Sequence, residues 1–299
     1  MEKKAVALAC RMDSEKAIRL TKTIMEFLLK KGESIYLETR IAPRILPHSE
    51  KDLNSMTINE IKFIISVGGD GTLLRVANSL PNRNPPPILG VNIGSIGFLD
   101  ESHERAIFKD LIKVLNGEYK LETCSRITAY LIKKNSEEIK LNSALNEILI
   151  VSSKNSKVLQ ISVKIDGIFL NRSYLDGVII STSIGSTAYN LSAGGAIVSP
   201  KLEIMQLTPL NPFARSGLKP IIIPIDSEIE IHLIRPRLNA KIIIDGQRVI
   251  KNIQPNSKIR ITGANSPIQF IRFDESYFKR LRKKIIGTLK VPLDDSPEE

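Results

Sequence analysis

The chain of 299 residues is long enough for two domains, and its 42% hydrophobic and 25% charged residues are ordinary for a soluble globular protein. No apolar run reaches the roughly 20 residues of a membrane helix, and charge returns soon after the first apolar stretch, which argues against a secretory signal and predicts a cytoplasmic protein with no membrane partner. The net charge of +11 is scattered and only 5% of residues are aromatic, which argues against a nucleic-acid partner but favours nucleotide and polyphosphate substrates.

The first part of the chain alternates short apolar strands with amphipathic helices. We expect strands at Lys4–Cys10, Ser34–Leu37, Phe63–Val67 and Ile88–Val91. We expect helices at Ser14–Lys31, Thr72–Ser79 and Glu104–Leu115. Strand, helix and strand in repetition indicate a Rossmann-like parallel sheet, so we predict an α/β domain over residues 1–122.

After Glu122 the strands become closely spaced and are joined by turns. They are expected at Ile127–Lys133, Lys140–Ser143, Glu147–Ser152, Val158–Ile165, Gly167–Leu170, Ile221–Ile223, Glu228–Ile234, Lys241–Ile244 and Lys258–Thr262. This spacing predicts an all-β domain over residues 123–269, an antiparallel sandwich or a barrel. The sequence DGQ at 245–247 is expected to turn a hairpin into Arg248–Ile250. Residues 270–287 look like an amphipathic helix in a C-terminal segment, 270–299, whose tail is expected to be disordered.

Metal and thiol chemistry find little support in the sequence. Cys10 and Cys124 are too few for a disulfide framework or a zinc site, and the three histidines lack metal-ligand spacing. We therefore expect reduced, structural thiols and no metal site built by the protein alone.

A glycine-rich stretch, SVGGDGTLL at 66–74, lies between an apolar strand and a helix-like segment. Gly68, Gly69, Gly71 and Thr72 would place backbone amides and a helix N-terminus where they favour phosphate. The stretch matches neither the dinucleotide fingerprint nor the P-loop. Asp70, an anion within this loop, is explained if it meets a Mg²⁺ ion or accepts the proton of a hydroxyl, and both are roles in phosphoryl transfer to an alcohol. A tight turn that needs glycine only for its geometry is the simpler alternative.

Two further stretches carry polar residues suited to a flat ligand. Asn146 and Glu147 open a strand in an apolar context, where an amide beside an acid binds a nucleobase or ribose, although a surface turn explains the spacing equally well. At 176–200, DGVIISTSIGSTAYNLSAGGAIVSP has small residues and hydroxyls around Tyr189, which can stack or hydrogen-bond, although a tightly packed turn is the simpler alternative.

Together these segments resemble the NAD kinase family, which phosphorylates the 2′-hydroxyl of the adenosine ribose of NAD. GGDGT at 68–72, Asn146-Glu147, the 176–195 stretch and DGQ occur in the family's order, and GVNIGSIGFL at 90–99 and YFKRLRKK at 277–284 also look like family segments. The resemblance implies an α/β domain and an all-β sandwich-like domain with the site between them, and a C-terminal segment that packs back on the first domain. It also implies NAD and ATP or polyphosphate as substrates, Mg²⁺ with the donor, and a homodimer or homotetramer.

The resemblance assigns roles to individual positions. Asp70 would approach the acceptor hydroxyl as general base or orienting group, and the glycine loop would hold the donor phosphates. The residues implied in NAD binding are Asp70, Gly71, Asn146, Glu147, Asp176, Thr187, Ala188, Tyr189, Ser192, Asn211 and Gln247.

The sequence departs from the family pattern at Ser95, Tyr174, Ser183 and Ile184. These departures concern phosphate handling and the choice between NAD and NADH, not the reaction class. A lipid kinase or a phosphofructokinase shares GGDGT but does not require the other segments. A non-catalytic dinucleotide sensor on the same fold differs in one respect, because it would not need Asp70.

Overall fold

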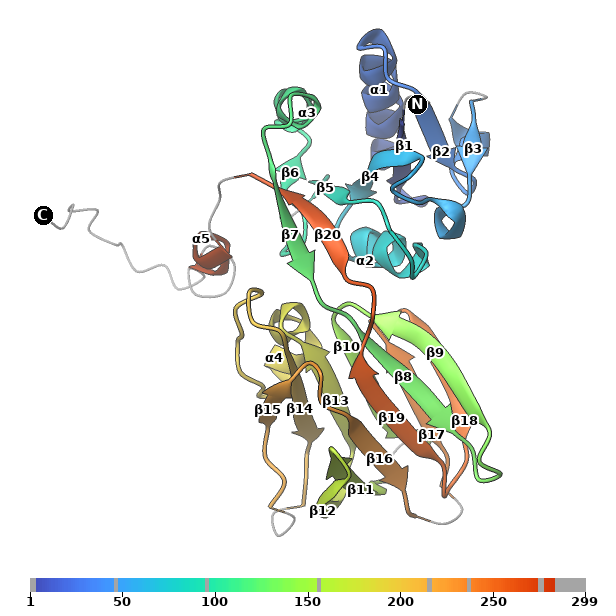
Figure 1. Ribbon diagram of the computed structural model, residues 1–299, viewed down its shortest axis with the longest axis vertical. Helices are drawn as coiled ribbons and strands as arrows, with labels where there is room; N and C mark the ends of the chain where they lie inside the picture. The colour runs from blue at the N-terminus through green and yellow to red at the C-terminus, as the bar shows by residue number, and fades with distance from the viewer. Residues whose placement is uncertain are drawn as a thin grey trace, which may run out of the picture.

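The computed structural model describes residues 4–45, 48–94, 97–154, 157–213, 217–235, 238–273 and 277–282. An α/β domain and an all-β domain follow one another along the long axis of the molecule (Figure 1). The predicted fold class, an α/β domain followed by an antiparallel β sandwich, is confirmed. No helix in the described ranges is long and apolar enough to cross a membrane.

An eight-stranded sheet forms the centre of the first domain, with the order β3-β2-β1-β4-β5-β20-β7 and β6 beside β5. All pairs are parallel except that of β20 with β7. The strands are β1 (Ala5–Cys10), β2 (Ile35–Glu38), β3 (Glu50–Lys51), β4 (Ile61–Gly68), β5 (Ile88–Asn92), β6 (Ser102–His103), β7 (Lys120–Cys124) and β20 (Ile268–Arg272). The helices are α1 (Glu15–Lys30), α2 (Asp70–Ser79) and α3 (Ile107–Leu115), with short 3₁₀ turns η1 (Ala42–Arg44) and η2 (Leu53–Ser55).

Alternate residues of β1 bury against different helices. Val6, Leu8 and Cys10 pack in the cluster that holds α1 and α3, whereas Ala5, Ala7 and Ala9 pack in the cluster that holds α2. Successive side chains of a strand point to opposite faces of its sheet, so β1 is buried on both faces, with α1 and α3 on one side and α2 on the other. Both cysteines are buried, free thiols whose pKa is raised mainly by burial.

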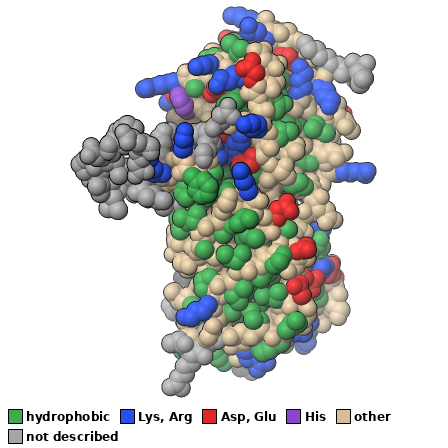
Figure 2. Space-filling view, turned by 60° about the vertical axis from the view of Figure 1, so that its left-hand side comes forward, with side chains coloured by type: hydrophobic (Ala, Val, Ile, Leu, Met, Phe, Trp, Pro, Cys, Tyr) green, Lys and Arg blue, Asp and Glu red, His purple; other side chains and the backbone are tan. Residues whose placement is uncertain are grey.

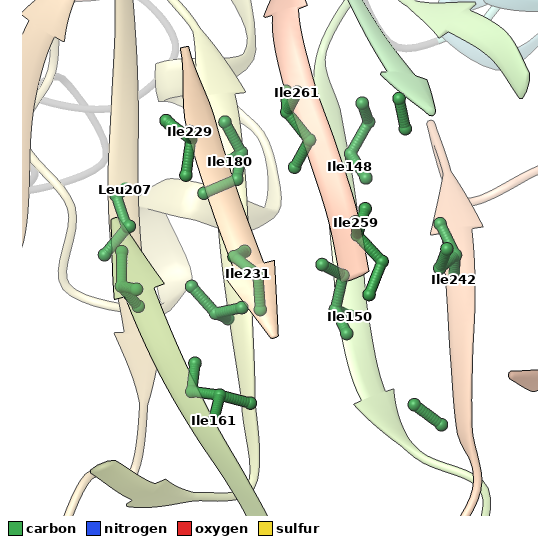
Figure 3. Packing of buried hydrophobic residues seen from close by; sticks show 14 of the residues in the cluster. Ile148, Ile150, Ile161, Ile180, Leu207, Ile229, Ile231, Ile242, Ile259 and Ile261 are labelled. Carbon is green, nitrogen blue, oxygen red and sulfur yellow. The ribbon is translucent and has the colours of Figure 1, made fainter. Parts of the chain in front are cut away.

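The second domain is a sandwich of two six-stranded antiparallel sheets, β15-β14-β13-β10-β17-β18 and β12-β11-β16-β19-β8-β9. Isoleucines from the two sheets meet between them, among them Ile148, Ile150 and Ile242 from one and Ile161, Ile231 and Ile259 from the other (Figure 3). The strands are β8 (Ile127–Ile132), β9 (Glu138–Ala144), β10 (Glu147–Ser152), β11 (Leu159–Ile165), β12 (Ile168–Leu175), β13 (Gly177–Thr182), β14 (Ile204–Leu210), β15 (Ile221–Pro224), β16 (Ile229–Leu233), β17 (Ala240–Ile244), β18 (Arg248–Ile253) and β19 (Lys258–Gly263). Two short helices, η3 (Ile184–Thr187) and α4 (Tyr189–Ser192), follow β13.

The helix predicted over residues 270–287 is wrong in its first part. Residues 270–272 belong to β20, which pairs with β5 at Ile88 and with every residue of β7. Among the described residues of this stretch, those of α5 (Tyr277–Leu281) form the helical part, and residues 283–299, including the tail expected to be disordered, lie outside the described residues. A strand forms here because Ile268, Phe270 and Ile271 are buried in the sheet. The strands that stabilise it, β5 and β7, lie far away in the sequence.

The two domains differ in their surfaces. On the face in Figure 2, Lys and Arg side chains gather over the α/β domain, whereas hydrophobic side chains are spread over the sandwich. Large apolar side chains also stand exposed on the edge strand β12, where Ile168, Phe169 and Leu170 are 74%, 58% and 42% exposed.

Candidate functional site

The glycine loop joins β4 to α2, as the sequence predicted. The helix begins at Asp70, two residues before the predicted start, with Gly69 as its N-cap in extended conformation. A β-carbon on Gly68 would stand 2.4 Å from Oγ1 of Thr72, whereas β-carbons on Gly69 and Gly71 would meet nothing within 4 Å. Gly68 is therefore needed for packing, and the other two glycines leave the backbone open to a ligand.

A cavity of about 720 Å³ lies over this open backbone and is lined by arginines from four parts of the chain. Arg11, Arg40, Arg75 and Arg248 surround Gly69, Gly71 and Thr72 there. Arg75 also forms a two-pronged ion pair with the buried Glu38. A helix N-terminus surrounded by guanidinium groups is suited to bind a chain of phosphates.

Asp70 is half-buried, and both of its oxygens are held by one loop of the same domain. Oδ2 accepts the Phe98 N–H at 2.7 Å and Oδ1 accepts the Leu99 N–H at 3.0 Å. Each bond occupies one lone pair, so each oxygen keeps capacity for a further donor or a cation. In the described part of the chain no group of three His, Cys, Asp or Glu side chains could hold a metal ion. A divalent ion at this site would therefore take its other ligands from a bound phosphate chain.

Asn146 and Glu147 lie in a segment whose backbone is fully engaged. The carbonyl of Leu145 accepts from Thr182 Oγ1 at 2.6 Å, and that of Asn146 accepts from the Thr182 N–H at 2.9 Å. In contrast, Oδ1 of Asn146 and Oε2 of Glu147 are buried without a hydrogen-bond partner. Burial, and then the charge of Asp245, raises the pKa of Glu147 to about 7. Buried polar atoms without partners on a fixed backbone are suited to bind a polar ligand.

The turn 244–247 joins this segment to the glycine loop. Asp245 is 5% exposed, and its carboxylate accepts the backbone N–H groups of residues 145, 146 and 147 at 2.8, 2.8 and 2.9 Å. The same carboxylate accepts from Nδ2 of Asn78, on α2, at 2.6 Å. Gln247 donates from Nε2 to the Gly71 carbonyl at 2.7 Å. The turn therefore contacts both domains, which the sequence did not reveal.

The segment after β13 is partly structural and partly exposed. A β-carbon on Gly185 would stand 2.0 Å from the Asn146 carbonyl oxygen, so the helical turn η3 rests directly on the Asn146 backbone. Ser186 is buried and accepts the Val198 N–H at 3.0 Å. Thr187 and Ala188 are half-buried, Tyr189 is 47% exposed, and Ser192 is exposed.

Asp176 and Asn211 lie at the other end of β13. Asn211 donates to Oδ2 of Asp176 at 2.9 Å, and Tyr174 packs edge-on against Phe213 beside them. The length of β13 separates this pair from Thr182 by roughly 20 Å. Of the predicted site residues, Gln247 contacts Gly71 and the turn 244–247 holds the backbone of Asn146 and Glu147, whereas Asp176 and Asn211 pair with each other at the far end of the strand.

The positions that depart from the family pattern have separate environments. Ser183 and Ile184 are buried, with Ser183 Oγ bonded to the Leu202 carbonyl. Tyr174 is 44% exposed, and Ser95 lies outside the described residues.

Comparison with known proteins agrees with this geometry. Residues 6–119 match the family model of the ATP-NAD kinase N-terminal domain, and residues 145–273 match that of the ATP-NAD kinase C-terminal domain. The chain is 33% identical to the NAD kinase of Thermococcus gammatolerans over 91% of this chain and 95% of that protein. It is 32% identical to the NAD kinase of Methanopyrus kandleri over 94% and 97%.

Solved structures have the same fold. An NAD kinase from Archaeoglobus fulgidus in complex with ATP superposes with a TM-score of 0.73 at 28% identity, over 95% of this chain and 99% of that one. The yeast NADH kinase complexed with NADH superposes with a TM-score of 0.84 at 23% identity, over 97% and 89%, which supports the fold alone. With both domains matched in order and relatives similar over nearly the whole length, the chain belongs to the ATP-NAD kinase family.

Proposed function

We propose that the protein transfers a phosphoryl group from ATP, or from inorganic polyphosphate, to the 2′-hydroxyl of the adenosine ribose of NAD, giving NADP. One observation carries the proposal: the turn 244–247 joins the segment that holds the unpartnered oxygens of Asn146 and Glu147 to α2, the helix that begins at Asp70 and whose N-terminal residues line the cavity together with the arginines. A donor on one side and an acceptor on the other are what phosphoryl transfer requires.

Asp70 acts on the acceptor hydroxyl. The hydroxyl oxygen attacks the terminal phosphorus of the donor, the bond from that phosphorus to the leaving phosphate breaks, and the hydroxyl proton passes to the Asp70 carboxylate. The Phe98 and Leu99 N–H groups orient this carboxylate. A divalent cation such as Mg²⁺, held by Asp70 and the phosphate oxygens, would neutralise charge that develops on the donor.

The donor phosphates bind in the cavity over the glycine loop. The open amides of Gly69 and Gly71, the N-terminus of α2 and the guanidinium groups of Arg75 and Arg248 provide its positive potential. The leaving phosphate departs toward these arginines, which stabilise its charge.

The acceptor binds on the other side of Asp70. Asn146 and Glu147 bind its hydroxyl or amide groups through their unpartnered oxygens, and Gln247 and Gly71 flank them. Thr187, Ala188, Tyr189 and Ser192 line the adenosine half, with the exposed ring of Tyr189 available to stack. Asp176 and Asn211 serve the nicotinamide end, at the far end of β13.

The same proposal includes a cytoplasmic homodimer or homotetramer. The exposed side chains of Ile168, Phe169 and Leu170 support self-association, because an apolar edge strand that stays unpaired in water promotes aggregation.

NADP formation from NAD tests the function, with ATP and with polyphosphate as donors. Asp70→Asn should bind NAD almost as well as the unchanged protein, measured by calorimetry, and should form no NADP with either donor. Asp226→Asn, on an exposed turn of the sandwich, serves as the matched control and should keep full activity. NAD binding without turnover in the unchanged protein would instead support a dinucleotide sensor.

A further inference from the structure

Asp245 occupies a turn whose geometry does not by itself require a carboxylate. Its φ is +48° and that of Gly246 is +65°, so both residues are left-handed in the hairpin loop 245–247, which joins Ile244 of β17 to its partner Arg248 of β18. Asn-Gly satisfies such a turn as well as Asp-Gly does. The turn alone therefore explains Gly246 but leaves the buried charge at position 245 unexplained.

The same domain holds a second Asp-Gly turn that shows the difference. Asp166 and Gly167 join β11 to β12 with φ values of +49° and +78°. The Asp166 side chain is exposed, and it accepts one backbone N–H, that of Glu228, at 2.8 Å. Asp245, by contrast, is buried and accepts four hydrogen bonds. Burial raises the pKa of Asp245, but only donors face its oxygens, so the ionised form fits this site.

Those four bonds connect the two sides of the proposed reaction. Three successive N–H groups, of residues 145 to 147, donate to the carboxylate. These bonds hold the stretch of backbone that carries the side chains of Asn146 and Glu147. The fourth donor, Asn78, lies about 12 Å along α2 from Asp70. Because Gln247 also holds Gly71 at the other end of α2, the turn contacts this helix at both ends.

We propose that Asp245 is a positioning residue: its carboxylate holds the acceptor-binding segment 145–147 against the helix that carries Asp70, so that hydroxyl and base meet at a fixed distance. This inference rests on the proposed function and adds a residue to it. Asp245 touches neither substrate, and it acts through the backbone of Asn146 and Glu147 and through Asn78.

The carboxylate also sets the electrostatic environment of its neighbours. Its charge adds to burial in raising the pKa of Glu147, and it opposes burial in the case of Arg126, whose pKa is lowered to about 10. Among the described groups whose pKa is shifted, Glu147 and Arg126 are those for which the charge of Asp245 is a cause. We therefore expect a substitution at position 245 to shift the pKa of Glu147. If the turn were only a mechanical link, the pKa of Glu147 would not change.

The test compares Asp245→Asn with Asp166→Asn, the same substitution in the same kind of turn. We expect kcat to fall about 30-fold or more in Asp245→Asn, because a misplaced reacting pair loses rate steeply, and to stay unchanged in Asp166→Asn. KM for the donor should change little. A kcat for Asp245→Asn within about threefold of the unchanged enzyme would overturn the proposal.

Two further measurements extend the test, and the first keeps it decisive if Asp245→Asn folds poorly. Asn78→Ala removes only the bond to α2, and it should lower kcat with little change in KM for NAD; an unchanged kcat would contradict the role of that bond. The Glu147 carboxyl, followed by ¹³C NMR in ligand-free protein and assigned with Glu147→Gln, should titrate at least about half a unit lower in Asp245→Asn. Because this readout needs no turnover, an unmoved midpoint would refute the inference even if the proposed function stands, whereas absence of NADP formation in the unchanged protein would refute the function itself, on which the inference rests.

Discussion

Gly97 leaves no room for a β-carbon beside Asp70, since such an atom would stand 1.9 Å from Oδ1. The backbone of this loop therefore lies directly against the carboxylate, and the next two residues donate their N–H groups to it. Close approach of the backbone, rather than a side chain, fixes the orientation of Asp70.

Gly97→Ala tests this arrangement. The added methyl group must displace either the loop or the carboxylate, and we expect kcat to fall about 100-fold, since catalytic geometry tolerates little displacement. Gly94→Ala is the control in the same loop, because its β-carbon would meet only Oδ1 of Asn92, at 4.0 Å. Steady-state kinetics of the two variants decide the matter, and equal rates would show that Asp70 is not held by this contact.

Glu147→Gln should change how stability depends on pH. The pKa of Glu147 is raised from 4.5 to about 7 in the folded protein, so the native state binds this proton more tightly than the unfolded chain does. Its contribution to stability is therefore present below about pH 4.5, is lost as the pH rises toward 7, and amounts to about 3 kcal/mol at most. The Gln variant does not lose this stability. Its free energy of unfolding should therefore exceed that of the unchanged protein by a margin that grows from pH 5 to pH 8.

Urea unfolding at the two pH values measures the difference. Glu26→Gln, on the exposed face of α1, is the control and should leave the pH dependence as it is. Parallel pH profiles for the unchanged protein and Glu147→Gln would show that the buried carboxyl does not titrate in this range. We expect Glu147→Gln to bind NAD more weakly even though it is more stable, which is a trade between stability and function.

Arg272→Met should destabilise the protein strongly. The guanidinium is buried, donates to Glu122 at 2.7 Å, lies 3.4 Å from Glu101, and donates to the Leu99 carbonyl at 2.7 Å. Removing it leaves two carboxylates without this partner, and breaking a buried ion pair costs about 3–5 kcal/mol. Arg260→Met also removes an arginine that pairs with two glutamates, on the sandwich surface, and should cost about 1 kcal/mol or less. Equal losses in urea unfolding would contradict the ranking.

Arg248→Gln tests the donor cavity. Arg248 lies at the start of β18 and lines the cavity over Gly69 and Gly71. Loss of one guanidinium from a phosphate site should raise KM for ATP about tenfold while KM for NAD stays the same. Lys251→Gln removes an exposed charge further along the same strand and should alter neither constant. A rise in KM for NAD alone would place the arginine on the acceptor side instead.

Features held in one contiguous stretch were predictable. The loop 68–72, the segment Asn146-Glu147 and the turn at 245–247 were each recognised as local patterns, because glycine, amide and carboxylate chemistry is visible in neighbouring residues. The sandwich was predictable for the same reason, since strand spacing and turn residues are local.

Features assembled from distant parts of the chain were not. The arginines of the cavity over the glycine loop come from four separate parts of the chain and share no spacing. The hydrogen bonds of Asp245 reach back 98 to 167 residues, and the turn alone already explains an Asp-Gly pair at this place in the sequence. The sequence around β20 predicts a helix instead of a strand, because the partners of this strand, β5 and β7, lie far upstream.

The return of β20 to the first sheet makes the sandwich an insertion within the α/β domain. Cys124, the last residue of β7, lies directly opposite Ile268, the first residue of β20, in an antiparallel pair. The sandwich therefore enters and leaves the first sheet through one pair of facing residues, and two of its side chains, Leu145 and Ile184, complete the buried cluster that holds α2.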